Sequence, residues 1–291
     1  MTVSALDELF GPLSDEPDAP PIPHISPSFL ERMLVCPEQV RREKILKEVR
    51  PTNTNLVFGT SLHRALEHNW LRKIDGNGSI GLKEMRDLAG DSFNETVEKE
   101  KNRNGIDWGT DKPHVVQEDV IVALVGKGDD PGYMQTLEPT VDPVACERWI
   151  RIEDTPVGYP LIGRIDVETA DGWVLDLKTS SKRKTQTDID KSIQGSAYVW
   201  ARGQEDAPAA GFAYHVLVKN KTPVQQELRT RRTARDMESF ERIMVRAVDT
   251  LHYCMEHYGP DEPWPGASMT DFLCSPRMCS FWGNGCVWRP A

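Results

Sequence analysis

Two acidic residues and a lysine stand close together in residues 161–178, a stretch with the pattern of a β-hairpin. Asp166 belongs to a first run of alternating apolar and polar residues, and Asp176 and Lys178 belong to a second run. Alternation with a period of two predicts two half-buried strands. Residues 170–172, which end in glycine, predict a three-residue loop whose last position is left-handed. This register places Asp166 directly opposite Asp176, where paired residues have Cβ atoms roughly 4.5–5.5 Å apart.

Carboxylates at this separation favour a cation between them, because two negative charges repel each other when no proton or cation intervenes. Asp166 and Asp176 offer the hard oxygen ligands that Mg²⁺ and Mn²⁺ prefer, and the main-chain carbonyl of Leu177 could supply a third. Lys178 points to the same side and could hold a water molecule or offset negative charge on a phosphate in the transition state. The stretch therefore predicts a divalent-metal site that hydrolyses a phosphodiester. The alternative is a charged, solvated face of the sheet.

Three residues on predicted helices could complete this site. His63 lies in a predicted helix over residues 59–74 and is the best candidate for a fourth metal ligand; the alternative is a partly exposed helix histidine. Gln194 and Tyr198 lie four residues apart in a predicted helix over 186–202, so they share one helix face. Both side chains can hydrogen-bond a phosphate or a base, which makes them candidates for contact with nucleic acid.

The cysteines suggest a second, separate site. There are six of them, namely Cys36, Cys146, Cys254, Cys274, Cys279 and Cys286. Disulfides are not expected in a cytosolic chain, where clustered cysteines suggest metal or redox chemistry. Three of them lie in an irregular C-terminal segment, and Cys36, just before a proline, is the candidate for a fourth thiolate. Four thiolates suit a [4Fe–4S] cluster or tetrahedral zinc, and four free cysteines are the remaining alternative. Cys146 and Cys254 fall in a predicted strand and a predicted helix, where a cysteine is usually a buried apolar residue.

A basic cluster follows the hairpin directly. Lys182, Arg183 and Lys184 stand beside Lys178 and could line a groove for nucleic acid, or could form a solvated loop. The net charge of −10 argues against a protein that coats nucleic acid non-specifically, because such proteins are usually basic. It does not exclude an enzyme with a local basic groove, because the charge near the substrate matters more than the total.

The surrounding sequence predicts the elements that must position these residues. Apolar residues recur at helical spacing over 29–49 (with a break at Cys36-Pro37), 59–74, 82–100, 114–126, 186–202 and 233–257. Strand-like alternation covers 146–152, the two arms of the hairpin, 211–218 and 224–230. Residues 51–57 and 101–113 are predicted to be a linker and a loop. The pattern indicates an α/β fold with a mixed central sheet flanked by helices.

Composition bounds the class of protein. The 291 residues are 38% hydrophobic and 27% charged, as is usual for a soluble globular protein. No apolar run approaches the ~20 residues that span a bilayer, and the N-terminus lacks the pattern of a secretory signal, so a cytoplasmic location is expected. Residues 1–25, rich in proline and acidic residues, predict a disordered tail. A single domain is expected over 26–291, with a mainly helical part (26–135), a catalytic sheet (140–232) and a helix with the cysteines (233–291).

Taken in order, these motifs resemble those of the PD-(D/E)XK nucleases of the RecB and AddB type, and of their stand-alone relatives in CRISPR adaptation and in phage genomes. The resemblance covers residues 26–288, and it is specific because the whole series occurs in the family's order. Its elements are Ser26-Pro27-Ser28-Phe29-Leu30 with Cys36-Pro37, Gly59 with His63, Gly163-Arg164-Ile165-Asp166, Asp176-Leu177-Lys178-Thr179, Gln194 with Tyr198, and the C-terminal cysteines.

The resemblance implies a restriction-endonuclease-like core that cleaves DNA with Mg²⁺ or Mn²⁺, expected to act as an exonuclease on single-stranded or end-bearing DNA. Asp166, Asp176 and Lys178 would be the catalytic residues, with His63 and the Leu177 carbonyl completing the metal site. It also implies a location in a bacterial or phage-infected cell and a role in DNA repair or recombination. The sequence has no G-x-x-x-x-G-K-[ST] loop, so a helicase or recombination partner would have to unwind DNA for it.

The resemblance further implies an iron–sulfur cluster that joins the two ends of the chain. The family's terminal cysteines usually run C-x2-C-x5-C, whereas the spacings here are four and six, which leaves zinc open as an alternative. Closing so long a loop would remove on the order of 4–5 kcal/mol of unfolded-state entropy, if a disulfide estimate is borrowed. Loss of the cluster is therefore expected to unfold the protein. Two other functions stay open: a catalytically silent iron–sulfur protein that binds DNA or assists recombination, and a redox sensor with a vestigial carboxylate site.

Overall fold

The computed structural model of the chain describes residues 20–219, 224–268, 271, 273–275, 279–282 and 285–288. These residues form two compact units. The central unit comprises Val49–Arg151 and Gly163–Arg242, and the terminal unit comprises the described parts of Met1–Glu48, Ile152–Ile162 and Ile243–Ala291. Each unit is discontinuous in sequence, and a single domain over residues 26–291 stays a prediction.

The sheet has five strands and is mixed, as the sequence predicts. The strands lie in the order β3 (Pro143–Ile152), β4 (Leu161–Thr169), β5 (Trp173–Ser180), β6 (Gly211–Val218) and β7 (Val224–Thr230). β5 is antiparallel to β4 and parallel to β6, and β7 is antiparallel to β6. β5, which carries two of the predicted catalytic residues, is therefore an interior strand.

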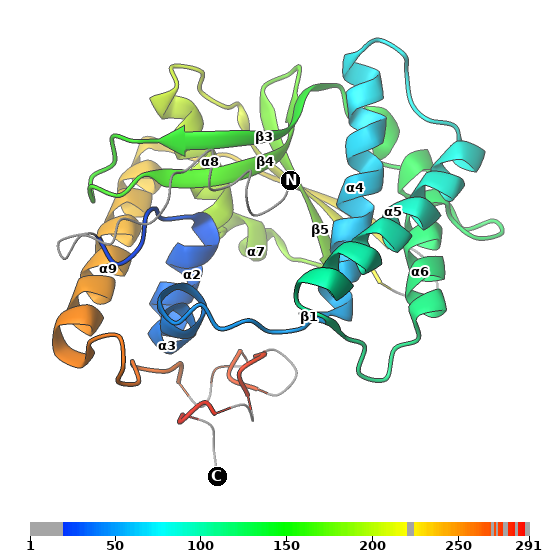
Figure 1. The fold of residues 1–291 in the computed structure, drawn as a ribbon. Coiled ribbons are helices and arrows are strands. Elements are labelled where there is room, and N and C mark those ends of the chain that lie inside the picture. The colour runs from blue at the N-terminus through cyan, green and yellow to red at the C-terminus, as the bar shows by residue number, and fades with distance from the viewer. Residues whose placement is uncertain are drawn as a thin grey trace. The chain divides into compact units, whose positions relative to one another are not determined.

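Helices cover both faces of this sheet in the central unit. On one side, α4 (Thr54–Ile74), α5 (Leu82–Arg103) and α6 (Pro113–Val125) lie beside one another (Figure 1) and share a hydrophobic core with residues of β4, β5 and β6. On the other side, α8 (Ile193–Gln204) packs on β6, where Tyr198 and Phe212 have ring centroids 6.4 Å apart. The short helix α7 (Gln186–Asp190) precedes α8. This layering matches a restriction-endonuclease-like core.

Short elements complete the central unit. β1 (Thr52–Asn53) pairs in parallel with β2 (Ile106–Asp107), and 3₁₀ turns cover Tyr133–Gln135 and Glu138–Thr140. The last helix, α9 (Ala234–Tyr258), begins in this unit and ends in the terminal unit.

The terminal unit brings an N-terminal helix pair to the C-terminal segment. α2 (Pro27–Val35) begins after Ser26, two residues before the predicted start at residue 29, and the Ser26 side chain accepts a hydrogen bond from the Phe29 amide at 3.2 Å. α3 (Pro37–Val40) continues into a π-helical turn (Arg41–Ile45). Cys36 is the residue between α2 and α3, where the following proline interrupts the helix.

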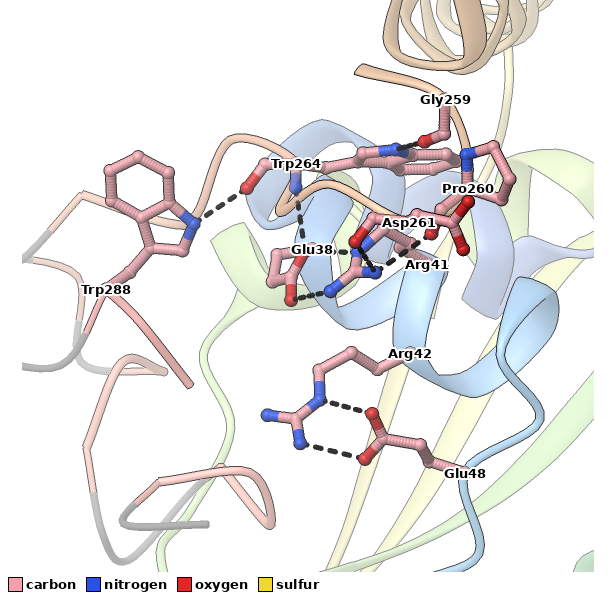
Figure 2. A network of polar contacts seen from close by, with 9 residues as sticks. All are labelled: Glu38, Arg41, Arg42, Glu48, Gly259, Pro260, Asp261, Trp264 and Trp288. Atoms are coloured by element: carbon pink, nitrogen blue, oxygen red, sulfur yellow. Dashed lines mark hydrogen bonds and ion pairs between the residues drawn. The ribbon is translucent and has the colours of Figure 1, made fainter. Parts of the chain in front are cut away.

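A buried polar network holds the segment after α9 against α3. Glu38 accepts hydrogen bonds from Arg41 Nε and from the Trp264 amide, both at 2.8 Å, while Arg41 Nη1 donates to the Pro260 carbonyl at 2.9 Å (Figure 2). Trp288 Nε1 donates to the Trp264 carbonyl at 2.7 Å. We refer to these residues, Glu38, Arg41, Pro260, Trp264 and Trp288, as the polar clamp. It joins α3 to the segment after α9 through side-chain and main-chain hydrogen bonds.

Several predicted boundaries are wrong. The helix expected to begin at residue 59 begins at Thr54, where the Asn53 side chain caps it by accepting from the Leu56 amide, so most of the predicted linker 51–57 is helical. The single helix predicted over 186–202 is two helices, because the Ser192 side chain accepts from the Gly195 amide at 3.0 Å and starts α8 anew.

Burial and order also differ from expectation. The strands β4 and β5 are buried on both faces rather than one, since helices cover the sheet on both sides. At the N-terminus, Ile22 and Ile25 are buried and Ile25 pairs with Leu161, so ordered structure begins before residue 26. The rest of the predicted tail, residues 1–19, lies outside the described residues.

None of the described helices combines the length and the apolar character that crossing a membrane requires.

Candidate functional site

The predicted hairpin is confirmed, including its register. Val167 pairs with Leu175, and Glu168 pairs with Val174, so Asp166 falls opposite Asp176 on the same ladder. Gly172 has φ +82°, the left-handed conformation that the three-residue loop requires. Because β5 is an interior strand, both carboxylates are buried: Asp166 is 8% exposed and Asp176 is 1% exposed.

α4 brings His63 to this pair of carboxylates. Its Nε2 lies 3.0 Å from the Leu177 carbonyl oxygen, and its Nδ1 lies 3.5 Å from Asp166 Oδ2. Gly59, one turn earlier on α4, lets the helix lie close to β5, because a Cβ there would stand 3.3 Å from Thr179 Oγ1. The two residues of the predicted G-x-x-x-H motif therefore have different roles. Gly59 allows close packing of α4 on β5, and His63 contacts the polar site.

Asp176 and Lys178 are linked to α8 by a chain of hydrogen bonds. Lys178 Nζ lies 2.7 Å from Asp176 Oδ2 and donates to Gln194 Oε1, also at 2.7 Å. Gln194 Nε2 donates to Asp176 Oδ1 at 2.7 Å and contacts the Tyr198 hydroxyl at 3.2 Å. Tyr198 in turn donates to the Arg164 carbonyl at 2.6 Å. The structure thus joins His63 to Asp166 and the Leu177 carbonyl, and joins Asp176 and Lys178 to Gln194.

The electrostatics of the group favour a cation. Burial raises the pKa of Asp176 to about 6, an effect that Lys178 opposes, and burial also raises the pKa of Asp166. Burial lowers the pKa of His63, but Asp166 and Glu147 raise it more strongly, to about 9. This favours a protonated His63 between the Leu177 carbonyl and the carboxylates when no ion is bound, and a divalent ion that His63 ligates would displace that proton. A divalent cation would satisfy the same oxygen atoms.

Glu147 is a member of the site that the sequence analysis missed. One ligand atom from each of His63, Glu147 and Asp166 lies within 4.8 Å of the others, so these three residues could hold a metal ion. Glu147 lies on β3 at φ +49°, a left-handed conformation that interrupts the alternation of the strand. In the sequence, Glu147 is marked only as an acidic residue in the strand before the hairpin. The alternating pattern of that strand does not distinguish it from its neighbours.

The arrangement fits a divalent ion. Asp176 Oδ2 is buried and makes its ion pair with Lys178 outside hydrogen-bonding geometry, so it still has a lone pair to offer. Carboxylate oxygens, a main-chain carbonyl and one imidazole form a donor set suited to Mg²⁺ or Mn²⁺.

The basic cluster lies apart from these hydrogen bonds. Lys182 and Arg183 are exposed, and Lys184 is half-buried, on the segment between β5 and α7. The Lys184 amide donates to Gln226 Oε1 at 3.0 Å, and Gln226 Nε2 donates back to the Lys184 carbonyl at 2.7 Å. This segment is thus anchored to β7 by its backbone, which leaves the lysine and arginine side chains of 182 and 183 directed to solvent.

The terminal unit contains the second candidate site. A cavity of about 250 Å³ is lined by the four predicted cysteines, Cys36, Cys274, Cys279 and Cys286, together with residues that include Trp282 and Trp288. Burial raises the pKa of Cys36, and the neighbouring Cys279 and Cys286 raise it further. Four cysteine side chains that line one cavity fit a thiolate-bound metal centre, because binding of a metal deprotonates its thiol ligands. Cys254 is buried in α9, and Cys146 is half-buried in β3.

Comparison with known proteins agrees with this fold. The family model of the PD-(D/E)XK nuclease superfamily matches residues 24–283. The fold is similar to the crystal structure of a candidate exonuclease from Eubacterium rectale, with a TM-score of 0.52, 14% identity and 87% of each chain covered. At that identity the likeness supports the fold alone. The crystal structure of SSO0001 shares 14% identity over 91% of this chain and 96% of that chain, but its TM-score of 0.34 supports no argument. No curated protein matches the sequence significantly.

Proposed function

Because the chain belongs to the PD-(D/E)XK nuclease superfamily, we propose that it is a divalent-metal-dependent deoxyribonuclease that degrades single-stranded or end-bearing DNA as an exonuclease. The observation that carries the proposal is the convergence of His63, Glu147 and Asp166 within 4.8 Å, next to the buried pair of Asp176 and Lys178. The description of the Eubacterium rectale protein as a candidate exonuclease is consistent with attack at DNA ends.

The metal ligands in this proposal come from three strands and one helix. His63, Asp166, Asp176, the Leu177 carbonyl and Glu147 would hold Mg²⁺ or Mn²⁺. The bound ion would supply a Lewis acid that polarises the phosphodiester and offsets the charge that develops in hydrolysis. The strands hold the two aspartates opposite each other, so the ligands are in place before the ion binds and little reorganisation is needed.

Lys178 would be the cation that contacts the reacting phosphate. Its ammonium lies 2.7 Å from Asp176 and has a third of its side chain exposed, so it can reach a substrate on the open side. Gln194 and Tyr198 are assigned a positioning role rather than direct contact with DNA, because their hydrogen bonds are internal and Tyr198 is 4% exposed. By fixing Asp176 and Lys178 they determine where the metal and the phosphate lie. Contact with the DNA backbone is assigned instead to the basic cluster, Lys182, Arg183 and Lys184.

The cysteine cavity is assigned a [4Fe–4S] cluster bound by Cys36, Cys274, Cys279 and Cys286, with tetrahedral zinc as the alternative. The four thiols line one cavity in the terminal unit, apart from the carboxylate residues in sequence and in chemistry. Its role would be structural. A helicase or a recombination protein would supply unwound DNA, since the sequence has no P-loop.

End-labelled single-stranded, double-stranded and circular DNA tests the proposed activity. The wild-type protein is expected to shorten linear DNA in Mg²⁺ or Mn²⁺, to spare circular DNA, and to be inactive with EDTA. Asp176→Asn should abolish cleavage without preventing folding. Binding of DNA with no cleavage under any metal would contradict the proposal and favour a silent accessory protein instead. Iron and sulfide analysis of anaerobically purified protein distinguishes the cluster from zinc.

A further inference from the structure

Arg164 lies on the same face of β4 as Asp166. Its guanidinium contacts Glu147, and its side chain is partly exposed to solvent. Nε is 2.5 Å from Glu147 Oε2, and Nη2 is 3.9 Å from Glu67 Oε2. The Arg164 side chain is 44% exposed, against 29% for His63 and 33% for Lys178. Arg164 is therefore the most solvent-accessible of the three cations at the carboxylates.

Glu147 stands between Arg164 and the proposed metal ligands. One carboxylate oxygen, Oε2, is paired with Arg164, while the other, Oε1, lies 3.8 Å from His63 Nδ1 on the metal side. The left-handed backbone at Glu147, φ +49°, costs a residue with a side chain free energy and persists where surrounding contacts hold it. The ion pair with Arg164 is such a contact. The single negative charge of Glu147 is thus shared between the guanidinium at Oε2 and, on the Oε1 side, any ion that His63 and Asp166 bind.

We propose that Arg164 is a substrate-positioning residue that couples metal binding to recognition of a DNA phosphate. Without metal, Arg164 neutralises Glu147. With an ion bound to Glu147, the guanidinium would be free to bind a phosphate of the DNA strand. This inference rests on the proposed nuclease function, and it assigns a role to Arg164, which is not among the catalytic residues and metal ligands named above, through its ion pair with the proposed ligand Glu147.

The chemistry of the guanidinium supports this exchange of partners. The planar guanidinium can donate two parallel hydrogen bonds to a carboxylate or to a phosphate. It can therefore exchange Glu147 for a DNA phosphate and keep the same hydrogen-bond geometry. Coupling of two ligands through one residue is reciprocal. If a divalent ion frees Arg164 for DNA, then DNA must raise the affinity of the site for the ion by the same factor.

Two binding measurements on the purified full-length protein test the exchange. The first is calorimetric titration with Mn²⁺ alone. Arg164→Gln is expected to bind Mn²⁺ about 3- to 10-fold more tightly than wild type, because the cation that competes for Glu147 is gone. The same substitution made in a Glu147→Gln background should have no effect. Glu67→Gln removes the other acidic neighbour of Arg164 and serves as the matched control, with Mn²⁺ affinity within twofold of wild type.

The second measurement is fluorescence anisotropy with a labelled single-stranded oligonucleotide, in EDTA and in Ca²⁺, under conditions in which the oligonucleotide stays intact. Arg164→Gln is expected to bind DNA about 10-fold more weakly than wild type in Ca²⁺ but within twofold of wild type in EDTA, where Arg164 is still held by Glu147. Arg164→Lys keeps the charge and should fall between the two in both measurements. If Arg164→Gln does not fold, Arg164→Lys is the variant that tests the proposal.

An ion pair with a purely structural role gives a different pattern. Lower Mn²⁺ affinity in Arg164→Gln, or equal weakening of DNA binding with and without Ca²⁺, would overturn the coupling. These outcomes are distinct from failure of the proposed function, which would appear as a wild-type protein that binds Mn²⁺ and DNA but never cleaves.

Discussion

At the scale of single residues, the two oxygens of the Asp176 carboxylate have different neighbours. Oδ1 accepts a hydrogen bond from Gln194, and Oδ2 faces Lys178 at 2.7 Å without hydrogen-bonding geometry. Oδ2 is thus the oxygen best placed to bind a further cation. Lys178 is held by the same two residues, so its ammonium is fixed before substrate arrives.

Substitution of these two residues is expected to separate metal binding from catalysis. Asp176→Asn should weaken Mn²⁺ binding by roughly 10- to 100-fold and abolish cleavage, because a charged ligand is lost. Lys178→Ala should keep the metal affinity but reduce the cleavage rate by about 10²–10³-fold, the usual effect of removing one preorganised group that stabilises transition-state charge. Calorimetry with Mn²⁺ and single-turnover cleavage measure the two effects.

The control for this pair is Lys191→Ala, which removes an exposed lysine at the end of α7. It should leave both quantities unchanged. Near wild-type turnover in Lys178→Ala would rule out its assignment as the catalytic lysine.

Gly163 shows how a single missing methyl group lets the site form. A Cβ at this position would stand 2.7 Å from Tyr198 Cε1 and 3.2 Å from Ile150 Cδ1. Gly163→Ala is therefore expected to displace Tyr198 and destabilise the fold by about 1–3 kcal/mol, as overpacking of a core does. Chemical denaturation measures this loss, and a fall in cleavage rate should accompany it, because Tyr198 supports Gln194.

Gly203→Ala is the matched control, because it adds the same methyl group on α8 with no atom within 4 Å. Replacing a helical glycine with alanine should stabilise the protein, by about 0.5–1 kcal/mol. A Gly163→Ala variant as stable as wild type would show that the close approach of Tyr198 to β4 is not required.

At the scale of elements, β6 and β7 carry a polar pair of side chains, His215 and Glu227. β6 is buried along its whole length, and His215 on it is 1% exposed. The Tyr133 hydroxyl lies 2.8 Å from His215 Nδ1, and Glu227, opposite His215 on β7, lies 3.5 Å from Nε2. The hydrogen bond with His215, and then Arg229, lower the pKa of Glu227 to about 2.

This shift predicts a pH-dependent contribution to stability. A carboxyl group with a lowered pKa stabilises the folded state above its unfolded pKa, near 4.5, and that contribution disappears as the pH falls through about 2. Glu227→Gln should thus lower the free energy of unfolding by about 1 kcal/mol at pH 7, a value reduced for the partial exposure of Glu227. The difference from wild type should shrink between pH 4.5 and 2, as measured by urea unfolding at a series of pH values.

Glu238→Gln removes the same charge from an exposed position on α9 and should change stability by less than about 0.5 kcal/mol at any pH. A difference between Glu227→Gln and wild type that stays constant with pH would show that packing, not ionisation, accounts for it.

At the scale of the whole molecule, two groups of contacts in the terminal unit join residues that are far apart in the sequence. One is the cavity lined by four cysteines, and the other is the polar clamp (Figure 2). Glu38 is 3% exposed and Arg41 is 7% exposed, so their ion pair and its hydrogen bonds to the segment 260–264 are buried. The clamp closes the same long loop as the proposed cluster, which changes the expectation that loss of the cluster unfolds the protein.

We expect the polar clamp to contribute more to the free energy of unfolding than the proposed cluster does. Glu38→Ala would leave Arg41 buried without its carboxylate and should cost about 3–5 kcal/mol, a large share of the about 5–15 kcal/mol that stabilises an ordinary domain. Cys36→Ser should lose iron and sulfide but still unfold cooperatively, at a lower temperature than wild type. Thermal unfolding by circular dichroism, with iron and sulfide analysis, distinguishes these outcomes.

Two variants control for this comparison. Glu43→Ala breaks a partly exposed ion pair with Arg32 in the same region and should cost less than about 1 kcal/mol. Cys146→Ser alters a cysteine outside the cavity and should keep the full metal content. An unfolded Cys36→Ser variant would show that the cluster is indispensable and the clamp insufficient.

The sequence by itself determined the hairpin and the series of motifs along it. Alternation, a glycine at the end of a three-residue loop and the register that follows are local properties, so they could be predicted to the residue, and Asp166 does lie opposite Asp176. The strands β6 and β7 were likewise bounded correctly, because turn residues enclose them. The boundary between α7 and α8 could have been predicted as well, since Ser192 precedes the helix as a capping residue does.

Only the tertiary structure decided which residues surround these motifs. Glu147 enters the site through a left-handed residue that breaks the period of its strand, and no periodic pattern can reveal such a break. Its ion pair with Arg164 joins two different strands, and the clamp joins Glu38 to Trp264 across most of the chain. Contacts of this kind depend on how elements pack rather than on neighbouring residues, so their partners become visible only when the chain is folded.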